Sequence, residues 1–193
     1  MILMGMANYF KEVVVIVPDL PALHTYRALG YNEHDAMEKV KNHRQGVERC
    51  YRRVSEQVLL NFGRQNIKIL MWGDDFTQEK YYQQACDRAF EIYRNNPEFS
   101  KTILHNTEHY ILARLEGQNV QQLGGMKNIA KKAAHYLIEE MAFHEQLHIV
   151  LGREPIVSYY RELELGINYI NGDYDNLQNE HVGYVTYNII DGE

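Results

Sequence analysis

The segment His144-Glu145-Gln146-Leu147-His148 matches the pattern in which two histidines one helical turn apart bind zinc. The glutamate between them would act as general base, and Glu162 or Glu164 could supply a third ligand. The helical spacing of apolar residues fades near Phe143, and a β-like run begins at Ile149. The sequence therefore favours a polar helix end here and keeps a zinc hydrolase as an alternative.

Tyrosines mark two further places that could do chemistry. Tyr136 and Glu140 are four residues apart, so on a helix they share one face, where a carboxylate could hold an ammonium group beside a phenol. Spacing alone favours a half-buried tyrosine with Glu140 in solvent. Tyr159 and Tyr160 end an apolar stretch, and strand ends in open α/β sheets often face the ligand crevice. The β-propensity of tyrosine explains that pair equally well.

A basic segment interrupts an otherwise acidic chain. Residues 39–53 hold six basic residues and one acid, a net charge of +5, although the whole chain has a net charge of −6. Arginines in a row on one helix face contact successive phosphates of a nucleic acid. A solvated helix surface remains the alternative. The candidate contacts are Lys41, Arg44, Arg49, Arg52 and Arg53.

The composition limits the class of protein. A length of 193 residues suits one domain, and 45% apolar with 24% charged residues excludes a disordered, collagen-like or rod-like chain. No stretch approaches the roughly 20 apolar residues of a membrane helix, and we expect no signal peptide. Two cysteines, Cys50 and Cys86, form no disulfide framework, which favours the cytoplasm. No phosphate-binding loop or dinucleotide fingerprint is visible.

Strand-like and helix-like segments alternate along the chain. Strands are expected at Met1–Met6, Val13–Val17, Ile67–Trp72, Ile149–Leu151, Ile156–Tyr159 and Val182–Ile190. Helices are expected at Glu33–Phe62 with Asn32 as N-cap, Thr77–Arg94 with Thr77 as N-cap, Pro97–Leu115 and Met126–Phe143, with a loop at Gly117–Gly125. This alternation predicts an α/β fold in which helices flank a mostly parallel sheet, as a single domain over 1–193.

One connection does not fit a parallel sheet. If the first two expected strands were parallel neighbours, a crossover of about a dozen residues would have to join them. Only Ala7–Glu12 is available. Either the two strands form an antiparallel hairpin, or a helix-sized segment is absent near residues 7–12.

The order of these segments resembles that of the tRNA-dependent cyclodipeptide synthases over nearly the whole chain. The matching segments are V-V-V-I-V-P-D, A-L-G-Y-N-E-H-D-A before the helix with E-R-C-Y-R-R, I-K-I-L-M-W, Tyr82 upstream of N-P-E-F, H-Y-L-I-E-E-M-A-F, V-S-Y-Y-R and H-V-G-Y-V-T-Y-N. The resemblance implies a Rossmann-like fold, similar to the catalytic domain of class I aminoacyl-tRNA synthetases. It also implies that two aminoacyl-tRNAs are joined into a cyclic dipeptide without ATP or a cofactor. We expect a cytoplasmic monomer that binds neither DNA nor membrane.

The resemblance also assigns roles to individual residues. Glu140 falls on the glutamate that holds the amino group of the aminoacyl moiety, and Tyr136 on the tyrosine one turn before it. Tyr159 falls on a tyrosine near the reaction centre, a proton relay in cyclisation. Three residues are assigned to the substrate pocket, namely Gly5, Tyr82 and Tyr160. The basic helix, with Arg49, Arg52 and Arg53, falls on the helix that engages tRNA.

The chain departs from the family at the nucleophile. The family carries a serine in G-x-S after the first strand, which accepts the aminoacyl group in a ping-pong sequence. In this sequence the corresponding residues are Gly5-Met6-Ala7, with alanine in place of the serine. Ser158 is too far along the chain to be assigned the role of nucleophile. The chain is then either an inactive relative that acts as a tRNA-binding module, or it lacks residues of the natural protein. We favour the second, because deleting a crossover helix would expose a buried sheet face. Tyr160, where histidine or proline is usual, leaves the subfamily open.

Overall fold

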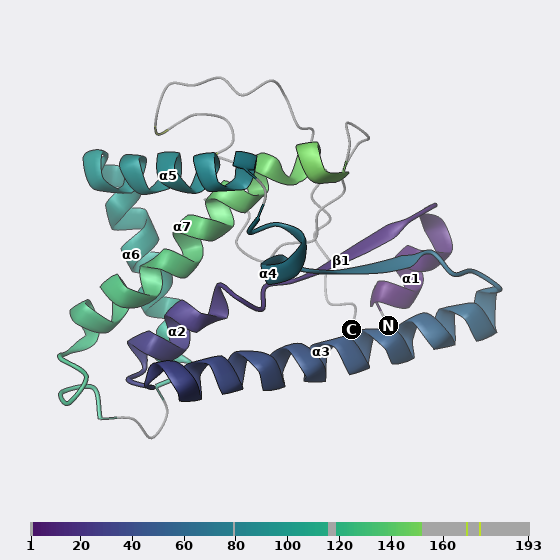
Figure 1. Ribbon diagram of the computed structural model, residues 1–193, viewed down its shortest axis with the longest axis horizontal. Helices are drawn as coiled ribbons and strands as arrows, with labels where there is room; N and C mark the ends of the chain where they lie inside the picture. Colours follow the sequence, from purple (N-terminus) through teal and green to yellow (C-terminus); the bar gives the residue numbers. More distant parts are fainter. Residues whose placement is uncertain (1, 79, 116–118, 152–168, 170–173, 175–193) are drawn as a thin grey trace, which may run out of the picture.

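The computed structural model describes residues 2–78, 80–115, 119–151, 169 and 174, and it contains two parallel strands flanked by helices (Figure 1). The α/β class is therefore confirmed. No helix in this part of the chain is both long and apolar enough to cross a membrane. The elements in chain order are α1 Ile2–Tyr9, β1 Val13–Val17, α2 Ala22–Ala28, α3 Glu33–Phe62, β2 Ile67–Met71, α4 Trp72–Asp75, α5 Lys80–Asn95, α6 Pro97–Leu112 and α7 Met126–Leu151.

The two strands are covered on both faces. β1 pairs with β2 in parallel along the whole of both strands. Val14 and Ile16 pack against the cluster that contains Phe143 of α7, whereas Val13 packs against Val58 of α3. Burial on both faces explains why β1 is an unbroken run of β-branched residues rather than an alternation of apolar and polar ones.

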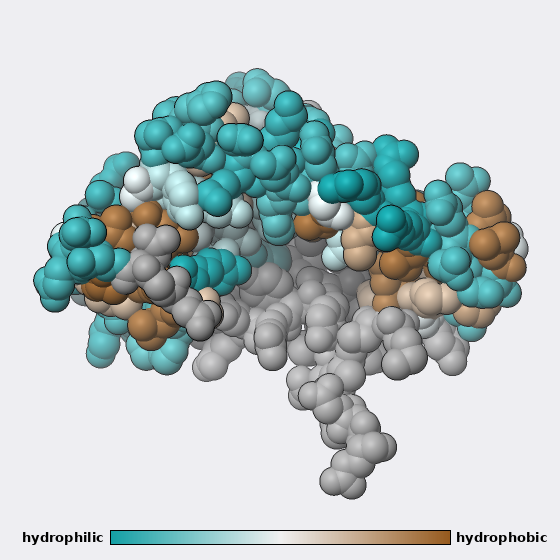
Figure 2. Space-filling model, turned by 90° about the horizontal axis from the view of Figure 1, so that it is seen from below, coloured by the Kyte–Doolittle hydropathy of each residue, from teal (hydrophilic) through white to brown (hydrophobic). Residues whose placement is uncertain are grey.

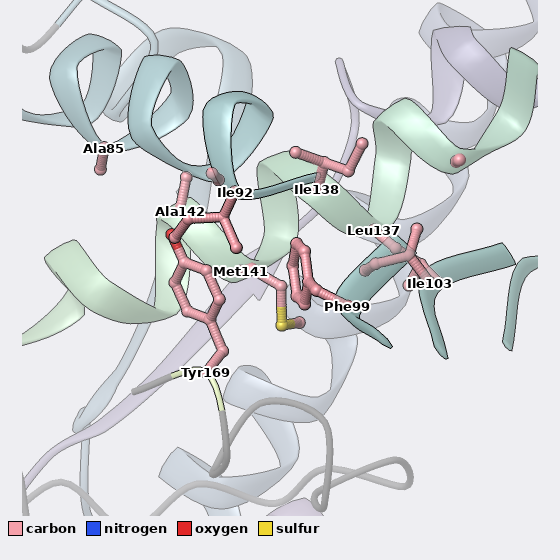
Figure 3. Packing of buried hydrophobic residues seen from close by; sticks show 11 residues of the cluster. Ala85, Ile92, Phe99, Ile103, Leu137, Ile138, Met141, Ala142 and Tyr169 are labelled. Atoms are coloured by element: carbon pink, nitrogen blue, oxygen red, sulfur yellow. The ribbon is translucent and has the colours of Figure 1, made fainter. Parts of the chain in front are cut away.

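Helix α7 lies at the centre of the helical part and packs against α2, α5 and α6 (Figure 1). Its side chains Leu137, Ile138 and Met141 fill a core cluster with residues of α5 and α6 (Figure 3). The helix continues to Leu151, so the predicted strand at Ile149–Leu151 is wrong. Three apolar residues are too short a run to separate a strand from a continuing helix. The strands expected at 156–159 and 182–190 lie outside the described residues.

The predicted strand at Met1–Met6 is also wrong, because Ile2–Tyr9 forms helix α1. Ala7 is fully buried against Val13 and Val58, and the side-chain amide of Asn66 donates to the carbonyl oxygen of Ala7 at 2.8 Å. A short apolar run cannot be assigned to strand or helix by periodicity. The described chain therefore enters β1 from a helix, so the pair of strands expected at Met1–Met6 and Val13–Val17 does not form. The absent segment near residues 7–12 and the single domain over 1–193 stay predictions.

The ends of two helices test the predicted caps. The side chain of Asn32 accepts a hydrogen bond from the backbone N–H of Asp35 at 2.9 Å, which confirms it as the N-cap of α3. Gly63 ends α3 in the left-handed conformation, at a φ of 65°. The N-cap predicted at Thr77 is wrong, because α5 begins at Lys80 and the Thr77 hydroxyl instead donates to the carbonyl of Gly73.

A buried carboxylate joins the carboxyl ends of both strands to α3. Asp19, which follows β1 and is 3% exposed, accepts a hydrogen bond from the backbone N–H of Gly73 at 2.8 Å. It also accepts one from Arg44 of α3 at 3.3 Å, and Arg44 pairs in addition with Asp74. A β-carbon at position 73 would lie 3.1 Å from that of Leu20, so glycine permits the close approach. We call Asp19, Arg44 and Gly73 the strand-end clasp.

Candidate active site

Helix α7 places Glu140 in the interior beside a half-buried Tyr136. Glu140 is 6% exposed, so the interpretation that put its carboxylate in solvent is wrong. The two residues share one helix face, as their spacing predicts. Burial disfavours the ionised form of a carboxyl group and costs stability, so a glutamate in a core helix is a candidate for function.

A second phenol, which the sequence analysis missed, lies at the same place. Tyr110 of α6 stacks on Tyr136, with ring centroids 5.5 Å apart and an interplanar angle of 17°. Burial raises the pKa of the Tyr110 phenol, Arg114 opposes that rise, and the negative charge of Glu140 adds to it. The Tyr110 phenol therefore responds to the charge at Glu140. The spacing of Tyr110 and Arg114, four residues apart in H-Y-I-L-A-R, was the available signal.

The neighbouring Glu139 serves a different cluster. Its Oε1 lies 2.8 Å from Nε2 of His24 on α2, and the His24 ring is 5.3 Å from the ring of His135. Burial lowers the pKa of His135, and the nearby His24 lowers it further. The two consecutive glutamates of α7 therefore have different surroundings, with His24 at Glu139 and Tyr136 on the helix face of Glu140.

Tyr82 lies in the apolar cluster under the strand ends. It is 5% exposed, and its hydroxyl accepts a hydrogen bond from Nε1 of Trp72 at 2.8 Å. Burial raises the pKa of the phenol well above its usual range, so Tyr82 stays protonated. Its assignment to the substrate pocket stays a prediction, and Tyr159 and Tyr160 lie outside the described residues.

The structure separates the predicted nucleophile position from the carboxyl ends of the strands. Gly5 and Ala7 lie on α1, which packs around Val13, the first residue of β1. These residues belong to a helix, whereas the resemblance expects a loop after a strand. The nucleophile position at Ala7 and the pocket role of Gly5 therefore stay predictions that the described contacts do not support.

The serines that the structure describes do not replace that nucleophile. Ser55 lies on α3 beside Val54, which packs in the cluster of α1. Ser100 donates a hydrogen bond to the carbonyl of Tyr93 at 2.6 Å and lies about 15 Å along α6 from Tyr110. Ser158 is outside the described residues.

Glu145, the general base expected in the zinc-binding interpretation, is held by other side chains. Glu145 forms an ion pair with Arg88 and accepts a hydrogen bond from the hydroxyl of Tyr169 at 3.4 Å. His144 is buried beside Phe143. The side chains of His148, Glu162 and Glu164 lie outside the described residues. Within the described chain, three potential metal ligands come together at one exposed place at the start of α3: His34, Asp35 and Glu38.

The basic residues of α3 divide into two groups. Lys41, Arg49 and Arg53 are exposed, and Arg52 is exposed with its guanidinium paired to Glu48. Arg44 instead belongs to the strand-end clasp, where its charge is paired with Asp19 and Asp74, so its role as a tRNA contact stays a prediction that these pairs disfavour. Seen from the side on which α3 lies in Figure 1, hydrophilic side chains gather over the upper part of the view and apolar patches lie at its two ends (Figure 2). Four basic side chains therefore remain available to a polyanion.

A comparison with known protein families shows which family the chain belongs to. A model of the cyclodipeptide synthase family matches residues 2–187. The chain belongs to the cyclodipeptide synthase family. Enzymes of this family are tRNA-dependent aminoacyltransferases. A comparison with curated protein sequences gives no match.

Solved structures of cyclodipeptide synthases share the fold. One from Bacillus thermoamylovorans is 23% identical and superposes with a TM-score of 0.72, covering 94% of this chain and 77% of that one. One from Staphylococcus haemolyticus is 18% identical, with a TM-score of 0.70 and coverage of 95% and 79%. One from Streptomyces noursei is 15% identical, with a TM-score of 0.65 and coverage of 97% and 85%. The Rossmann-like fold expected from the sequence is confirmed.

The burial of His144 predicts how the stability of this cyclodipeptide synthase depends on pH. Burial lowers the pKa of His144 to about 4, below the usual value near 6.5. The unfolded chain therefore binds a proton between those two values and the folded one does not, so stability falls as pH drops from 6.5 to 4. We expect a loss of up to about 3 kcal/mol across this window. Urea unfolding at several pH values measures it.

The matched variants separate His144 from other groups. His144→Gln should flatten the pH dependence in that window, whereas His43→Gln, at an exposed position of α3, should leave it unchanged. An equally steep dependence in His144→Gln and the wild type would contradict the assignment of His144 as a neutral core residue.

Proposed function

We propose that this protein joins two aminoacyl groups, each delivered by an aminoacyl-tRNA, into a cyclic dipeptide, without ATP or a cofactor. The observation that carries the proposal is the buried Glu140 on the same face of α7 as Tyr136, whose ring stacks on that of Tyr110. An aminoacyl ester is already activated, so the chemistry requires no phosphate-binding loop. It requires a place that holds the α-ammonium group and keeps the ester carbonyl in reach.

The carboxylate and the phenols suit that task. Glu140 would bind the α-ammonium group, and a charge-assisted hydrogen bond is strongest where water is excluded. The hydroxyl of Tyr136, one helical turn before Glu140, would donate a hydrogen bond to the bound aminoacyl group or accept one from it. We assign Tyr159 as proton relay for ring closure, and Tyr82 and Tyr160 to the side-chain pocket. Each peptide bond forms when an amine attacks an ester carbonyl, with an alcohol as leaving group.

We further propose that the family's ping-pong route, in which a serine hydroxyl first displaces the tRNA ribose hydroxyl, applies only where the natural protein supplies a serine that this chain lacks. The chain as written would join the two groups by direct transfer between aminoacyl-tRNAs. Neither Ser55 nor Ser100 is positioned for this step. Purified 193-residue chain incubated with radiolabelled aminoacyl-tRNAs, quenched in acid and separated by gel should therefore carry no label. Labelled protein would contradict that expectation. Cyclic dipeptide with unlabelled protein would mean direct transfer between two aminoacyl-tRNAs.

The second candidate function is a tRNA-binding module without catalysis. The placement of the described serines away from Glu140 favours it. It predicts salt-sensitive tRNA binding with no cyclic dipeptide under any condition. The same incubation, analysed by mass spectrometry for diketopiperazines, separates the two functions. We propose a cytoplasmic monomer in both cases, with aminoacyl-tRNA as partner.

The exposed arginines of α3 give a prediction for tRNA binding. Arg49→Gln combined with Arg53→Gln should weaken tRNA binding about 10-fold at roughly 0.1 M salt, because two phosphate contacts are lost. The slope of log affinity against log salt should become shallower by about 2. Filter binding over a salt series measures both quantities.

A control removes the same charge elsewhere. Arg94→Gln combined with Lys101→Gln neutralises two exposed residues on α5 and α6 and should leave the salt slope unchanged. Equal losses in the two double variants would show that overall charge, and not the α3 surface, attracts tRNA.

A further inference from the structure

The side chains of Arg114, Tyr110 and Tyr136 stack on one another between the surface and the candidate active site, and we call them the aromatic column. The guanidinium carbon of Arg114 lies 3.6 Å from the centroid of the Tyr110 ring, and its Nη1 donates to the carbonyl oxygen of Tyr110 at 3.1 Å. The Tyr110 ring stacks on Tyr136 of α7. Arg114 is exposed and Tyr136 is half-buried, so the column runs inward from the solvent.

The column constrains the side chain of Tyr136. Tyr136 has two side-chain torsions, and packing against neighbouring elements selects among their rotamers. Nearly parallel stacking with an offset is a favoured aromatic arrangement, and a guanidinium over the ring face favours it further. Tyr136 lies one turn before Glu140, and its χ1 torsion sets where its hydroxyl lies relative to that carboxylate. A ring that stacks on Tyr110 cannot swing about χ1 without losing the stack.

We propose that Tyr110 is a positioning residue, whose ring fixes the orientation of Tyr136 while Arg114 holds the Tyr110 ring from the solvent side. This inference rests on the proposed function, in which Tyr136 faces the bound aminoacyl group. The positioning comes from the ring of Tyr110 and does not require its hydroxyl. The Tyr110 hydroxyl could also act in its own right, so the ring and the hydroxyl are tested separately.

The first test observes Tyr136 directly and needs no activity. 3-Fluorotyrosine is placed at position 136 and its fluorine resonance is recorded in the folded protein. Tyr110→Leu should move the resonance toward its position in the urea-unfolded protein, whereas Tyr110→Phe should leave it near that of the wild type. Arg114→Gln, a change at an exposed position, should give a smaller shift in the same direction. An unchanged resonance in Tyr110→Leu would overturn the proposal.

The matched control removes a comparable ring that has a different role. Tyr93→Leu removes a half-buried tyrosine of α5 that packs on the same core cluster as Tyr136. It should leave the resonance at position 136 in place. A shift as large as that of Tyr110→Leu would mean that general loosening of the core moves Tyr136. If Tyr110→Leu does not fold, Arg114→Gln decides the matter, since its unchanged resonance would equally overturn the proposal.

The second test is kinetic. Tyr110→Leu should lower kcat for cyclic dipeptide formation about 10-fold, with KM for aminoacyl-tRNA within about twofold, because misorientation acts on the bound complex. Tyr110→Phe should restore kcat to within about threefold of the wild type. Unchanged kcat in Tyr110→Leu would overturn the catalytic part of the proposal. A wild-type protein without product would count against the proposed function, and the fluorine resonance would still decide whether Tyr110 fixes Tyr136.

Discussion

Glu140→Gln should lower the rate of cyclic dipeptide formation at least about 100-fold, the usual cost of losing a preorganised electrostatic partner. The amide has the shape of the carboxylate but no charge, so it cannot offset the cost of bringing an ammonium group into a buried site. The variant should be at least as stable as the wild type, because a buried carboxylate is replaced by a neutral group. Initial rates with purified aminoacyl-tRNAs, followed by mass spectrometry, measure the effect.

The adjacent glutamate is the matched control. Glu139→Gln makes the same chemical change one residue away, where the side chain pairs with His24 and can still hydrogen-bond to it. We expect its rate within about threefold of the wild type. Equal losses in both variants, or a Glu140→Gln enzyme that keeps most of its rate, would contradict the assignment of the ammonium site to Glu140.

Arg44→Met should lower the free energy of unfolding by about 2 kcal/mol, because it leaves the buried carboxylate of Asp19 without its guanidinium partner. The N–H of Gly73 still donates to Asp19, and Arg44 is partly exposed, so the loss should stay below that of a fully buried pair. Urea denaturation measures the stability. The salt slope of tRNA binding should not change, since the charge of Arg44 is held within the protein.

A surface ion pair provides the comparison for Arg44. Arg52→Met removes a guanidinium from the exposed pair with Glu48 on the same helix and should change stability by less than about 0.5 kcal/mol. It should reduce the salt slope of tRNA binding by about 1. An Arg44→Met variant that keeps the stability of the wild type but shows a shallower salt slope of tRNA binding would give the opposite result. It would restore the prediction from the sequence that Arg44 contacts tRNA.

The sequence predicts those elements whose signals are local. β1 is an unbroken β-branched run ended by Pro18, and α3 has both helical spacing and a capping Asn32, so both were found within a residue of their ends. The order of such elements along the chain was also enough to identify the family. The spacing of Tyr136 and Glu140 placed both on one face, although spacing alone did not show that Glu140 is buried.

The features that the sequence missed depend on contacts between distant segments. Tyr110 becomes part of the site because α6 packs on α7, and no local pattern shows which face meets Tyr136. Arg44 looks like any basic residue of a helix until Asp19, 25 residues earlier, is found beneath it. The short apolar run Met1–Met6 fits a strand or a helix equally, and the strand expected there is a helix in the structure.

The most direct test of the central claim is a mass-spectrometric search for cyclic dipeptides in the medium of cells that express the intact gene. The proposed function predicts diketopiperazines that are absent from cells with empty vector and that fall at least about 100-fold in cells expressing Glu140→Gln. Medium without any cyclic dipeptide, from cells whose protein is folded and binds aminoacyl-tRNA, would contradict the claim and leave the tRNA-binding module as the function.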